Sequence, residues 1–544
     1  MPARRVSFAL IVLAVALRVA AILLLRSYVV PRSTYEHGEI AANLLAGRGF
    51  STRFLGADGP TSQQAPIYPL IVAASYAIGG IETPQALLLL QLTQAVLGGV
   101  LVAGVLSLAR ELAPDQPKVA IAAGLLAAIH PTLIYSATHV QVASLAAALL
   151  TWTLALAYRA GRTGRDRDAM IAGLVLGLLI LTDPILSLVA PAIVMVIAAR
   201  RSPNSGSFGE FSVGPTSVGP NSTVAIRLDP CKRRVLLVPT EDRGNEDGAI
   251  RFSRVNNGLF RDIDKKARLK SDLPDSQPLG KAKRYDVRPR NKSAGRSVAI
   301  LGLMAAMCVA PWIARNFRVH GEFIFVKSTF GYAFWQGNCA LSQGTDKVQR
   351  LSIEEALKPK GTSLEDWNRA LWKARHEAGY IDDIALTKAD YAILGKLTEP
   401  ARSRLLLQRA LKNLLADPWR YPKLCVKRLR YFVLFDETNP KTRSLVYRTS
   451  HVGLTLLAFI GVIVMPAALR RRLVPTFLTA GLIAAFHVFT LVSARFHVPL
   501  EPLMAVCAAG SLAKTLSASP TGNVVGVVLH HRLSVKKVLS GSLR

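Results

Sequence analysis

The chain has 544 residues, of which 51% are hydrophobic and only 19% are charged, and its mean hydropathy is +0.30. Its 67 lysines and arginines outnumber 35 acidic residues, which gives a formal net charge of +32. This composition excludes collagen-like, coiled-coil and fully disordered proteins. The five cysteines are scattered without a C-x-x-C pair, so we expect neither a disulfide framework nor a structural zinc site. The positive charge falls between long apolar runs, which indicates a polytopic membrane protein rather than a nucleic-acid-binding one.

Apolar runs of the length that a membrane helix needs, about 20 residues, recur along the chain. The first contains Arg18 and has no small-residue cleavage site before Pro31, so we expect a retained anchor rather than a signal peptide. Proline breaks the chain at Thr182-Asp183-Pro184, between the fifth and sixth runs, which could also form one re-entrant pair. The predicted spans are 6–27, 85–109, 118–137, 140–158, 169–183, 184–199, 297–314, 450–469, 474–493 and 498–515.

The distribution of lysine and arginine in the short loops predicts the orientation. With ten alternating spans, the basic segments Met1–Arg5, 159–167, 470–472 and the C-terminal tail share one side, which we assign to the cytoplasm. The run Ile67–Gly79 is too short to cross a bilayer, so we expect a helix lying at the outer interface.

This orientation predicts the domain organisation. An N-terminal transmembrane module, 1–200, contains a first outer loop at 28–84, where we expect catalysis. A C-terminal module, 297–515, contains a large outer loop at 315–449, and 516–544 form a cytoplasmic tail. In the large loop, Arg402 to Phe435 alternate basic and apolar residues and break at Asp417-Pro418, as expected of amphipathic helices on a membrane surface.

A polar insert, residues 201–296, separates the two modules. It holds 20 lysines and arginines against 11 acidic residues and is rich in glycine, proline, serine and asparagine. Val235-Leu236-Leu237-Val238 could form a strand, but the segment lacks enough apolar residues for a sizeable core. We expect a mostly disordered cytoplasmic insert, with binding of anionic lipid as the alternative.

The sequence lacks the common motifs of nucleotide-binding proteins and of hydrolases. It has no Walker A loop, no G-x-G-x-x-G after a strand, no H-E-x-x-H and no G-x-S-x-G. Carboxylates within the predicted spans are scarce, and Asp183, the clearest, is expected to cap a helix beside Pro184. Proton-coupled transporters usually need several such acids, so this scarcity argues against a transporter.

Five short elements gather on the predicted outer face. The first runs from Tyr35 to Phe50 and contains Glu36-His37-Gly38-Glu39-Ile40-Ala41-Ala42-Asn43; a helix here places Glu36, Ile40 and Asn43 on one face. The others are Pro66-Ile67-Tyr68-Pro69, Pro311-Trp312-Ile313-Ala314-Arg315-Asn316, Phe334-Trp335-Gln336-Gly337-Asn338 and Arg495-Phe496-His497-Val498-Pro499.

These elements, in this order, resemble the C-type (GT-C) glycosyltransferases, the superfamily of protein O-mannosyltransferases and the lipid A aminoarabinose transferase. The likeness is greatest to bacterial relatives of glycosyltransferase family 39 and covers most of the chain outside 201–296. Two departures stand out. The family commonly has an Asp-Glu pair where this chain has Arg32, Ser33 and Thr34, and its T-R-P element is Thr182-Asp183-Pro184 here.

The resemblance implies an all-α polytopic fold, a GT-C-like bundle of about ten to twelve transmembrane helices with interfacial helices on the outer face. It also implies transfer of a sugar from a polyprenyl-phosphate donor, by an inverting displacement, to a glycolipid, an envelope glycan or a protein hydroxyl. Such a reaction needs a base for the acceptor proton and cations for the departing phosphate.

We assign candidate roles on that basis. Glu36 is the expected base, with Glu39 in reserve. Arg315 and Arg495 are candidate phosphate ligands, since a guanidinium matches phosphate oxygens; snorkelling to lipid headgroups is the alternative. His497 could join the phosphate site or cap a span. The candidate sugar contacts are Gln64, Tyr68 and Trp335, for which turn, interface and aromatic-belt packing are the alternatives.

His130, His139 and His487 lack a metal-ligand spacing. Oligosaccharyltransferase relatives use a divalent metal, but the resemblance to the protein mannosyltransferase branch implies none, so we expect neither a required metal nor another cofactor. The sequence therefore predicts a multi-pass glycosyltransferase of the inner (plasma) membrane with a cytoplasmic N-terminus, no nucleic-acid partner, and chemistry on the outer face. Two rivals remain open: a carrier or flippase for lipid-linked sugars, and a non-catalytic scaffold that recruits partners through 201–296.

Overall fold

The computed structural model describes residues 2–29, 34–199, 223–229, 234–240, 291–346, 386–439, 442 and 444–518. The chain forms two compact units, one of Met1–Arg200 with Pro289–Arg544 and one of Arg201–Arg288. Most of the predicted insert and nearly all of the predicted tail lie outside the described residues.

Helices form at every predicted span of the large unit, so the expectation of an all-α polytopic membrane protein is confirmed. Among the described residues, five helices are long and apolar enough to cross a bilayer, or six if the pair bent by 53° at His130 counts as one span. These helices are α1 (Pro2–Leu24), α4 (Pro84–Leu112), α7 (Ala143–Thr163), α10 (Asn291–His320), α17 (Leu445–Val464) and the bent pair α5 (Pro117–Ile129) and α6 (Pro131–Tyr135).

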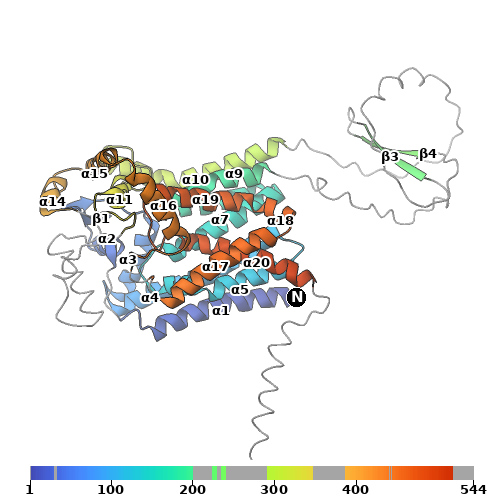
Figure 1. Ribbon diagram of the computed structural model, residues 1–544, viewed down its shortest axis with the longest axis horizontal. Coiled ribbons are helices and arrows are strands. Elements are labelled where there is room, and N and C mark those ends of the chain that lie inside the picture. The colour runs from blue at the N-terminus through green and yellow to red at the C-terminus, as the bar shows by residue number, and fades with distance from the viewer. Residues whose placement is uncertain are drawn as a thin grey trace, which may run out of the picture. The chain divides into compact units, whose positions relative to one another are not determined.

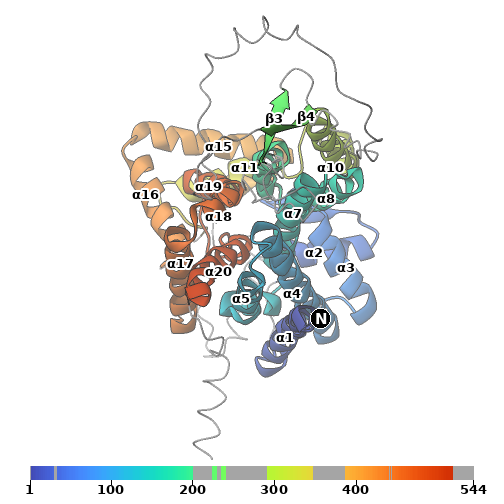
Figure 2. The ribbon, with the colours of Figure 1, turned by 90° about the vertical axis from the view of Figure 1, so that its right-hand side faces the viewer.

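The other predicted spans form shorter helices, which are α8 (Asp166–Ile180), η2 (Pro184–Val189) with α9 (Ala190–Ala198), α19 (Val474–Phe489), and η5 (Val498–Leu500) with α20 (Glu501–Ala518). Asp183 separates α8 from η2 and accepts a hydrogen bond from the backbone N–H of Ile185 at 3.2 Å, which is the cap expected from the sequence. These short helices pack against neighbouring helices of the bundle: α8 packs on α10 and α7, and α20 packs on α17 and α5. In Figure 2, α1, α4 and α5 lie side by side.

The basic short loops of the bundle meet at the end where α1 begins. Arg110 at the end of α4 donates to Ser7 of α1, and Tyr158 of α7 donates to the Arg472 carbonyl at 2.6 Å. Arg472 in turn donates to the Leu112 carbonyl at 3.0 Å. Arg472 belongs to α18 (Ala467–Arg472). The positively charged loops that the sequence placed on one side of the membrane therefore do share one end of the bundle.

The opposite end carries a layer of short elements (Figure 1). They are α2 (Tyr35–Leu45), the strands β1 (Ser51–Phe54) and β2 (Ala57–Pro60), α3 (Ile67–Gly79), α11 (Phe330–Asn338), α14 (Lys388–Leu394), α15 (Glu399–Ala416) and α16 (Arg420–Val433). The break between α15 and α16 falls at Asp417–Trp419, where proline was expected to interrupt the helix. Exposed apolar side chains line this helix pair, including Leu415 at 79% and Val426 at 70%. We expect them to face lipid headgroups and acyl chains.

A hairpin in the first outer loop was not predicted. β1 and β2 pair antiparallel, with Phe54 opposite Ala57, so the loop is only Leu55-Gly56. Both residues have positive φ, 51° and 84°, as a tight type I′ turn requires. Leu55 is 2% exposed, and a Cβ on Gly56 would lie 2.8 Å from the Tyr391 carbonyl oxygen. The hairpin tip is therefore packed against α14.

In the smaller unit, the described residues form an antiparallel hairpin of β3 (Thr223–Asp229) and β4 (Arg234–Thr240). β4 contains Val235 to Val238, the segment from which the sequence predicted a strand.

Close helix packing in the large unit depends on glycines. On α17, a Cβ at Gly461 would lie 2.1 Å from the Cys507 carbonyl oxygen of α20, whereas a Cβ at Gly453 would meet nothing within 4 Å. Gly461 therefore sets the distance between the two helices, and Gly453 does not.

Gly461→Ala should lower the stability of the detergent-solubilised protein by about 2 kcal/mol, because the clash is with backbone that cannot rotate away. Thermal unfolding followed by intrinsic fluorescence measures this. Gly453→Ala on the same helix is the control and should leave the midpoint unchanged or raise it. Equal midpoints for the two variants would contradict the close packing of α17 on α20.

Candidate functional site

Helix α2 holds the two glutamates proposed as bases, and they have different surroundings. The helix runs Tyr35–Leu45, and Gly47, with φ at 74°, lies just beyond its end. Ile40 is fully buried and fixes which side of α2 faces the protein. Glu39 accepts a hydrogen bond from the backbone N–H of Arg53 at 2.7 Å, so it anchors strand β1. Glu36 lies one turn earlier on α2 and is half-buried.

Arg315 ties the first outer loop to the end of α10. Its guanidinium donates to the carbonyl oxygens of Thr61 at 2.6 Å and Phe50 at 3.0 Å, and to Ser62 Oγ at 3.1 Å. The guanidinium also lies 4.9 Å from the centre of the Trp312 ring. These contacts use both terminal nitrogens. Arg315 therefore holds the backbone of the first outer loop.

Glu399, in the first turn of α15, fastens the same loop from the other side. Its carboxylate accepts from Thr61 Oγ1 at 2.6 Å, from the backbone N–H of Ser62 at 2.7 Å and from Ser328 Oγ at 2.5 Å. With 6% of its surface exposed, Glu399 is a buried carboxylate fully supplied with donors.

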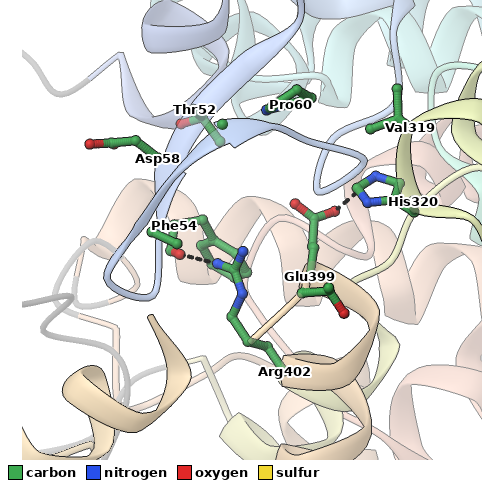
Figure 3. A pocket seen from close by; sticks show the side chains of 11 residues that line it. Thr52, Phe54, Asp58, Pro60, Val319, His320, Glu399 and Arg402 are labelled. Atoms are coloured by element: carbon green, nitrogen blue, oxygen red, sulfur yellow. Dashed lines mark hydrogen bonds and ion pairs between the residues drawn. The ribbon is translucent and has the colours of Figure 1, made fainter. Parts of the chain in front are cut away.

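A cavity of about 210 Å³ lies between the hairpin, the end of α10 and the start of α15. Figure 3 shows Arg402 reaching the Phe54 carbonyl and His320 facing Glu399 across this cavity. Arg402 thus binds the hairpin, and Glu399 binds Thr61 and Ser62 just after it. The cavity therefore lies where the first outer loop and the large outer loop pack together.

Fastening the first outer loop in this way brings Gln64 next to Lys327. The Lys327 ammonium donates to Gln64 Oε1 at 3.1 Å, and the backbone N–H of Ser328 donates to the Ser62 carbonyl at 2.9 Å. Lys327 follows the apolar run Phe323–Val326 and is half-buried. A lysine is thus held beside the first outer loop.

Five titratable groups act on one another at this place: Glu36, His37, Asp183, Lys327 and Arg495. The charges of Glu36, Lys327 and Arg495 all act on the His37 imidazole, and those of Lys327 and Arg495 act on Asp183. Lys327 in turn responds to Asp183, Arg495 and Glu36. We call these five residues the charge cluster. It joins α2, the α8–η2 break, the segment after α10 and the segment after α19.

The pKa values in the charge cluster are shifted mainly by burial. Burial lowers the pKa of His37 to about 4; Glu36 opposes this shift, and the two cations reinforce it. Burial lowers the pKa of the Lys327 ammonium, and the charge of Asp183 opposes that shift. His37 is therefore neutral at pH 7.

Arg495 is the candidate phosphate ligand that remains accessible. Its side chain is 47% exposed, lies over the Phe496 ring and has Asp346 3.9 Å away. The segment before it is held in place because Val492 donates to the Gly344 carbonyl at 3.1 Å and accepts from Asp346 N–H at 3.2 Å. The backbone is thus fixed while the guanidinium faces outward.

The other candidate contacts lie elsewhere or below the surface. Tyr68 is buried beneath His37, with ring centres 4.9 Å apart, and donates to Gln94 at 3.2 Å. Trp335 is 9% exposed and packs in an apolar cluster with Phe54 and Leu406. His497 is 2% exposed and bonds to the Tyr447 hydroxyl at 2.7 Å. None of these three offers a surface to a sugar as the described residues stand.

The structure brings three residues proposed from the sequence, Glu36, Gln64 and Arg495, together with Lys327 and His37, to which the sequence analysis gave no role. Asp183 was noticed only as a cap, yet it also belongs to the charge cluster. The signal for Lys327 was a lone cation directly after four apolar residues on the predicted outer face. His37 stands next to Glu36, but nothing in the pattern of α2 distinguishes it from an exposed helical residue. As arranged, the cluster can accept a proton at a carboxylate and neutralise an anion with two cations.

The family resemblance is supported by comparison with known proteins. Residues 63–208 match the family model described as "Dolichyl-phosphate-mannose-protein mannosyltransferase", which confirms the resemblance to C-type glycosyltransferases over about a quarter of the chain. Of the five elements noted in the sequence, Pro66–Pro69 lies within this match. No curated protein matches the chain in sequence.

Solved structures of two glycosyltransferases are similar at low identity. Archaeal oligosaccharyltransferase AglB from Archaeoglobus fulgidus, in complex with an inhibitory peptide and a dolichol-phosphate, is 11% identical with a TM-score of 0.45. That match covers 99% of this chain, which spans about half (52%) of the AglB chain. ArnT from Cupriavidus metallidurans bound to undecaprenyl phosphate is 12% identical with a TM-score of 0.33, covering 92% of this chain and 78% of ArnT.

The lowered pKa of His37 predicts a pH dependence of stability. Because His37 has a pKa of about 4 in the folded protein and of about 6.5 when unfolded, acid protonates the unfolded state first. Stability from the neutral ring is thus complete above about pH 6.5 and is lost as the pH falls towards 4. His37→Phe keeps an aromatic ring against Tyr68 and should lose less stability over this window. Thermal midpoints of both proteins between pH 7 and pH 4.5 test this; parallel curves would contradict it.

Proposed function

We propose that this chain, whose residues 63–208 belong to the dolichyl-phosphate-mannose-protein mannosyltransferase family, transfers a monosaccharide from a polyprenyl-phosphate donor to an acceptor hydroxyl. The acceptor is a glycolipid, an envelope glycan or a protein. The observation that carries the proposal is the charge cluster, in which a carboxylate on the first outer loop shares one electrostatic environment with Lys327 and Arg495.

The reaction we propose balances within that cluster. The acceptor oxygen forms a bond to the anomeric carbon while the bond from that carbon to the phosphate oxygen breaks. Glu36 takes the acceptor proton as general base, and Lys327 and Arg495 stabilise the additional negative charge on the leaving polyprenyl phosphate. Attack from the face opposite the phosphate inverts the configuration of the sugar, as the family resemblance implies.

The surroundings of the two helical glutamates support Glu36 over Glu39 as the base. Glu39 accepts the Arg53 N–H and contributes to the hairpin, so using it as a base would disturb strand β1. Asp183 is the other carboxylate beside the two cations, but it already caps η2 through Ile185. The hydrogen bond from Lys327 to Gln64 supports a role for Gln64 in contacting the sugar or the phosphate.

The location of the charge cluster supports outer-face chemistry. It lies at the end of the bundle away from the basic short loops, and lysine- and arginine-rich loops favour the cytoplasmic side. On this basis we place the N-terminus in the cytoplasm, the protein in the inner (plasma) membrane and the reaction on the outer face. The donor's lipid tail would stay in the bilayer while its phosphate reaches Arg495.

Glu36→Gln should lower transfer by about 10²–10⁴-fold, because an amide cannot accept the proton. Mass spectrometry of polyprenyl-linked sugars and envelope glycans, at equal membrane levels of wild type and variant, measures it. We expect one glycan addition to disappear and the matching lipid-linked monosaccharide to accumulate. Glu39→Gln is the control on the same helix and should retain most transfer. If Glu36→Gln matches wild type while Asp183→Asn is inactive, Asp183 is the base; if both are active, a lipid-sugar carrier is favoured.

Replacing residues 203–288 by a short glycine–serine linker should leave transfer unchanged within measurement error. The insert belongs to a separate compact unit, and the charge cluster draws on none of it. The same mass-spectrometric measurement applies. Complete loss of transfer in a variant that inserts at wild-type levels would instead support the scaffold hypothesis, in which the insert recruits a partner.

A further inference from the structure

Three histidines and a glutamate meet inside the bundle, apart from the charge cluster. His130 stands at the bend between α5 and α6, His451 on α17, His497 just before η5, and Glu501 at the start of α20. They are 7%, 1%, 2% and 0% exposed. The ring nitrogens lie 3.2 Å (His497), 3.5 Å (His451) and 3.4 Å (His130) from the Glu501 carboxylate oxygens.

The facing atoms approach without forming hydrogen bonds. His130 Nε2, His451 Nδ1, His497 Nδ1 and both Glu501 oxygens are buried and lack a hydrogen-bond partner among the described residues. A buried carboxylate with no donor is costly, and such groups are normally paired or coordinate a metal. These buried nitrogen and oxygen atoms therefore need a partner other than the four side chains themselves.

The far side of His451 fixes its tautomer. Its Nε2 lies 3.2 Å from the Val433 carbonyl, which can only accept, so Nε2 carries the hydrogen. In the neutral ring, Nδ1 then points a lone pair at the Glu501 carboxylate. Two facing lone pairs repel each other unless a proton or a metal cation lies between them.

Protonating the histidines does not resolve the whole cluster. The rings of His451 and His497 have centres only 4.0 Å apart, so two imidazolium ions would repel each other in a buried site. One divalent cation can accept the lone pairs of both rings and bind the carboxylate at once. The ligand atoms of His451, His497 and Glu501 already lie within 4.8 Å of one another.

We propose that His451, His497 and Glu501 bind a divalent transition metal, with Zn²⁺ the best match, and that His130, whose Nε2 lies 3.4 Å from the second Glu501 oxygen, positions the carboxylate. Imidazole nitrogens with one carboxylate oxygen in a tetrahedral set suit zinc. The outer contacts are those of a metal site as well: the Val433 carbonyl and the Tyr447 hydroxyl, at 3.2 Å and 2.7 Å, orient the two rings from behind. This proposal departs from the expectation from the sequence that no metal is required.

The metal would act as a positioning element. It would join α17 to α20 through the segment that also carries Arg495, two residues before His497. Holding this segment fixes the backbone from which Arg495 reaches the charge cluster, while the metal itself stays buried below it.

Metal content of the full-length protein, purified in detergent without a histidine tag or chelator, tests the proposal. Inductively coupled plasma mass spectrometry should give about one zinc per chain in wild type and several-fold less in His451→Ala and Glu501→Gln. His487→Ala is the matched control, because His487 is also buried (4% exposed) but bonds to the Leu491 carbonyl at 3.1 Å outside the cluster. Zinc retained by the cluster variants, or lost equally from the control, would overturn the proposal.

A measurement on wild type alone covers the case in which the cluster variants fail to fold. Metal-stripped protein reconstituted with Co²⁺ should show the visible absorption of a tetrahedral site with nitrogen and oxygen ligands, and should saturate at one Co²⁺ per chain. Excess Zn²⁺ should abolish the signal. Failure of stripped, folded wild type to bind either metal stoichiometrically would show that the cluster is satisfied by protons.

Discussion

Two opposite charges, the half-buried Arg315 and the buried Glu399, hold the outer layer of this protein together through one short piece of backbone. Both side chains grip Thr61 and Ser62, the first from the end of α10 and the second from the start of α15. Charge-assisted hydrogen bonds are among the stronger polar contacts, and removing one partner would leave the other buried and uncompensated. We call Arg315 and Glu399, with the Thr61–Ser62 backbone between them, the clamp. Gln64 and Lys327 lie on either side of the clamp, so the clamp sets the geometry of the charge cluster.

The same clamp explains why some motif residues have architectural roles. Asn316 follows Arg315 and binds the Ile324 and Val326 carbonyls, which sets the turn before Lys327. Asn338 accepts from the buried Arg428, and Gly337 leaves room for that guanidinium and for the Thr490 carbonyl. A motif can therefore mark a protein family because it positions an active site, without any of its side chains touching substrate.

Much of the fold follows from the sequence, because its signals are local. Apolar length predicted the helices, the positive residues predicted which loops share an end, and Pro418 predicted the break between α15 and α16. The β1–β2 hairpin was missed because its strands have four residues each and its turn places Leu55, a residue type that seldom takes positive φ, in that conformation. Here the tertiary contact with α14 decides the local structure.

The site was only partly predictable for a similar reason. Glu36 and Arg495 stand in recognisable motifs, but Lys327 and Asp183 become neighbours only when four distant segments meet. The histidines showed no ligand spacing along the chain, since His130, His451 and His497 come from three different elements. Arg315 and Trp335 also stand in motifs, but their partners in the structure, backbone carbonyls and apolar side chains, leave no pattern in the sequence.

The clamp also has a consequence for the order of biosynthesis. Thr61 and Glu399 are 338 residues apart, and Phe54 and Arg402 are 348 apart. The first outer loop thus emerges long before its fastening side chains have been translated. Contacts of such sequence separation form late, because the intervening chain must first be ordered. A ribosome-bound or truncated chain that has inserted its first spans contains Glu36 but not Glu399 and Arg402, which fasten the loop around it. Assembly of the site is thereby coupled to completion of the C-terminal half.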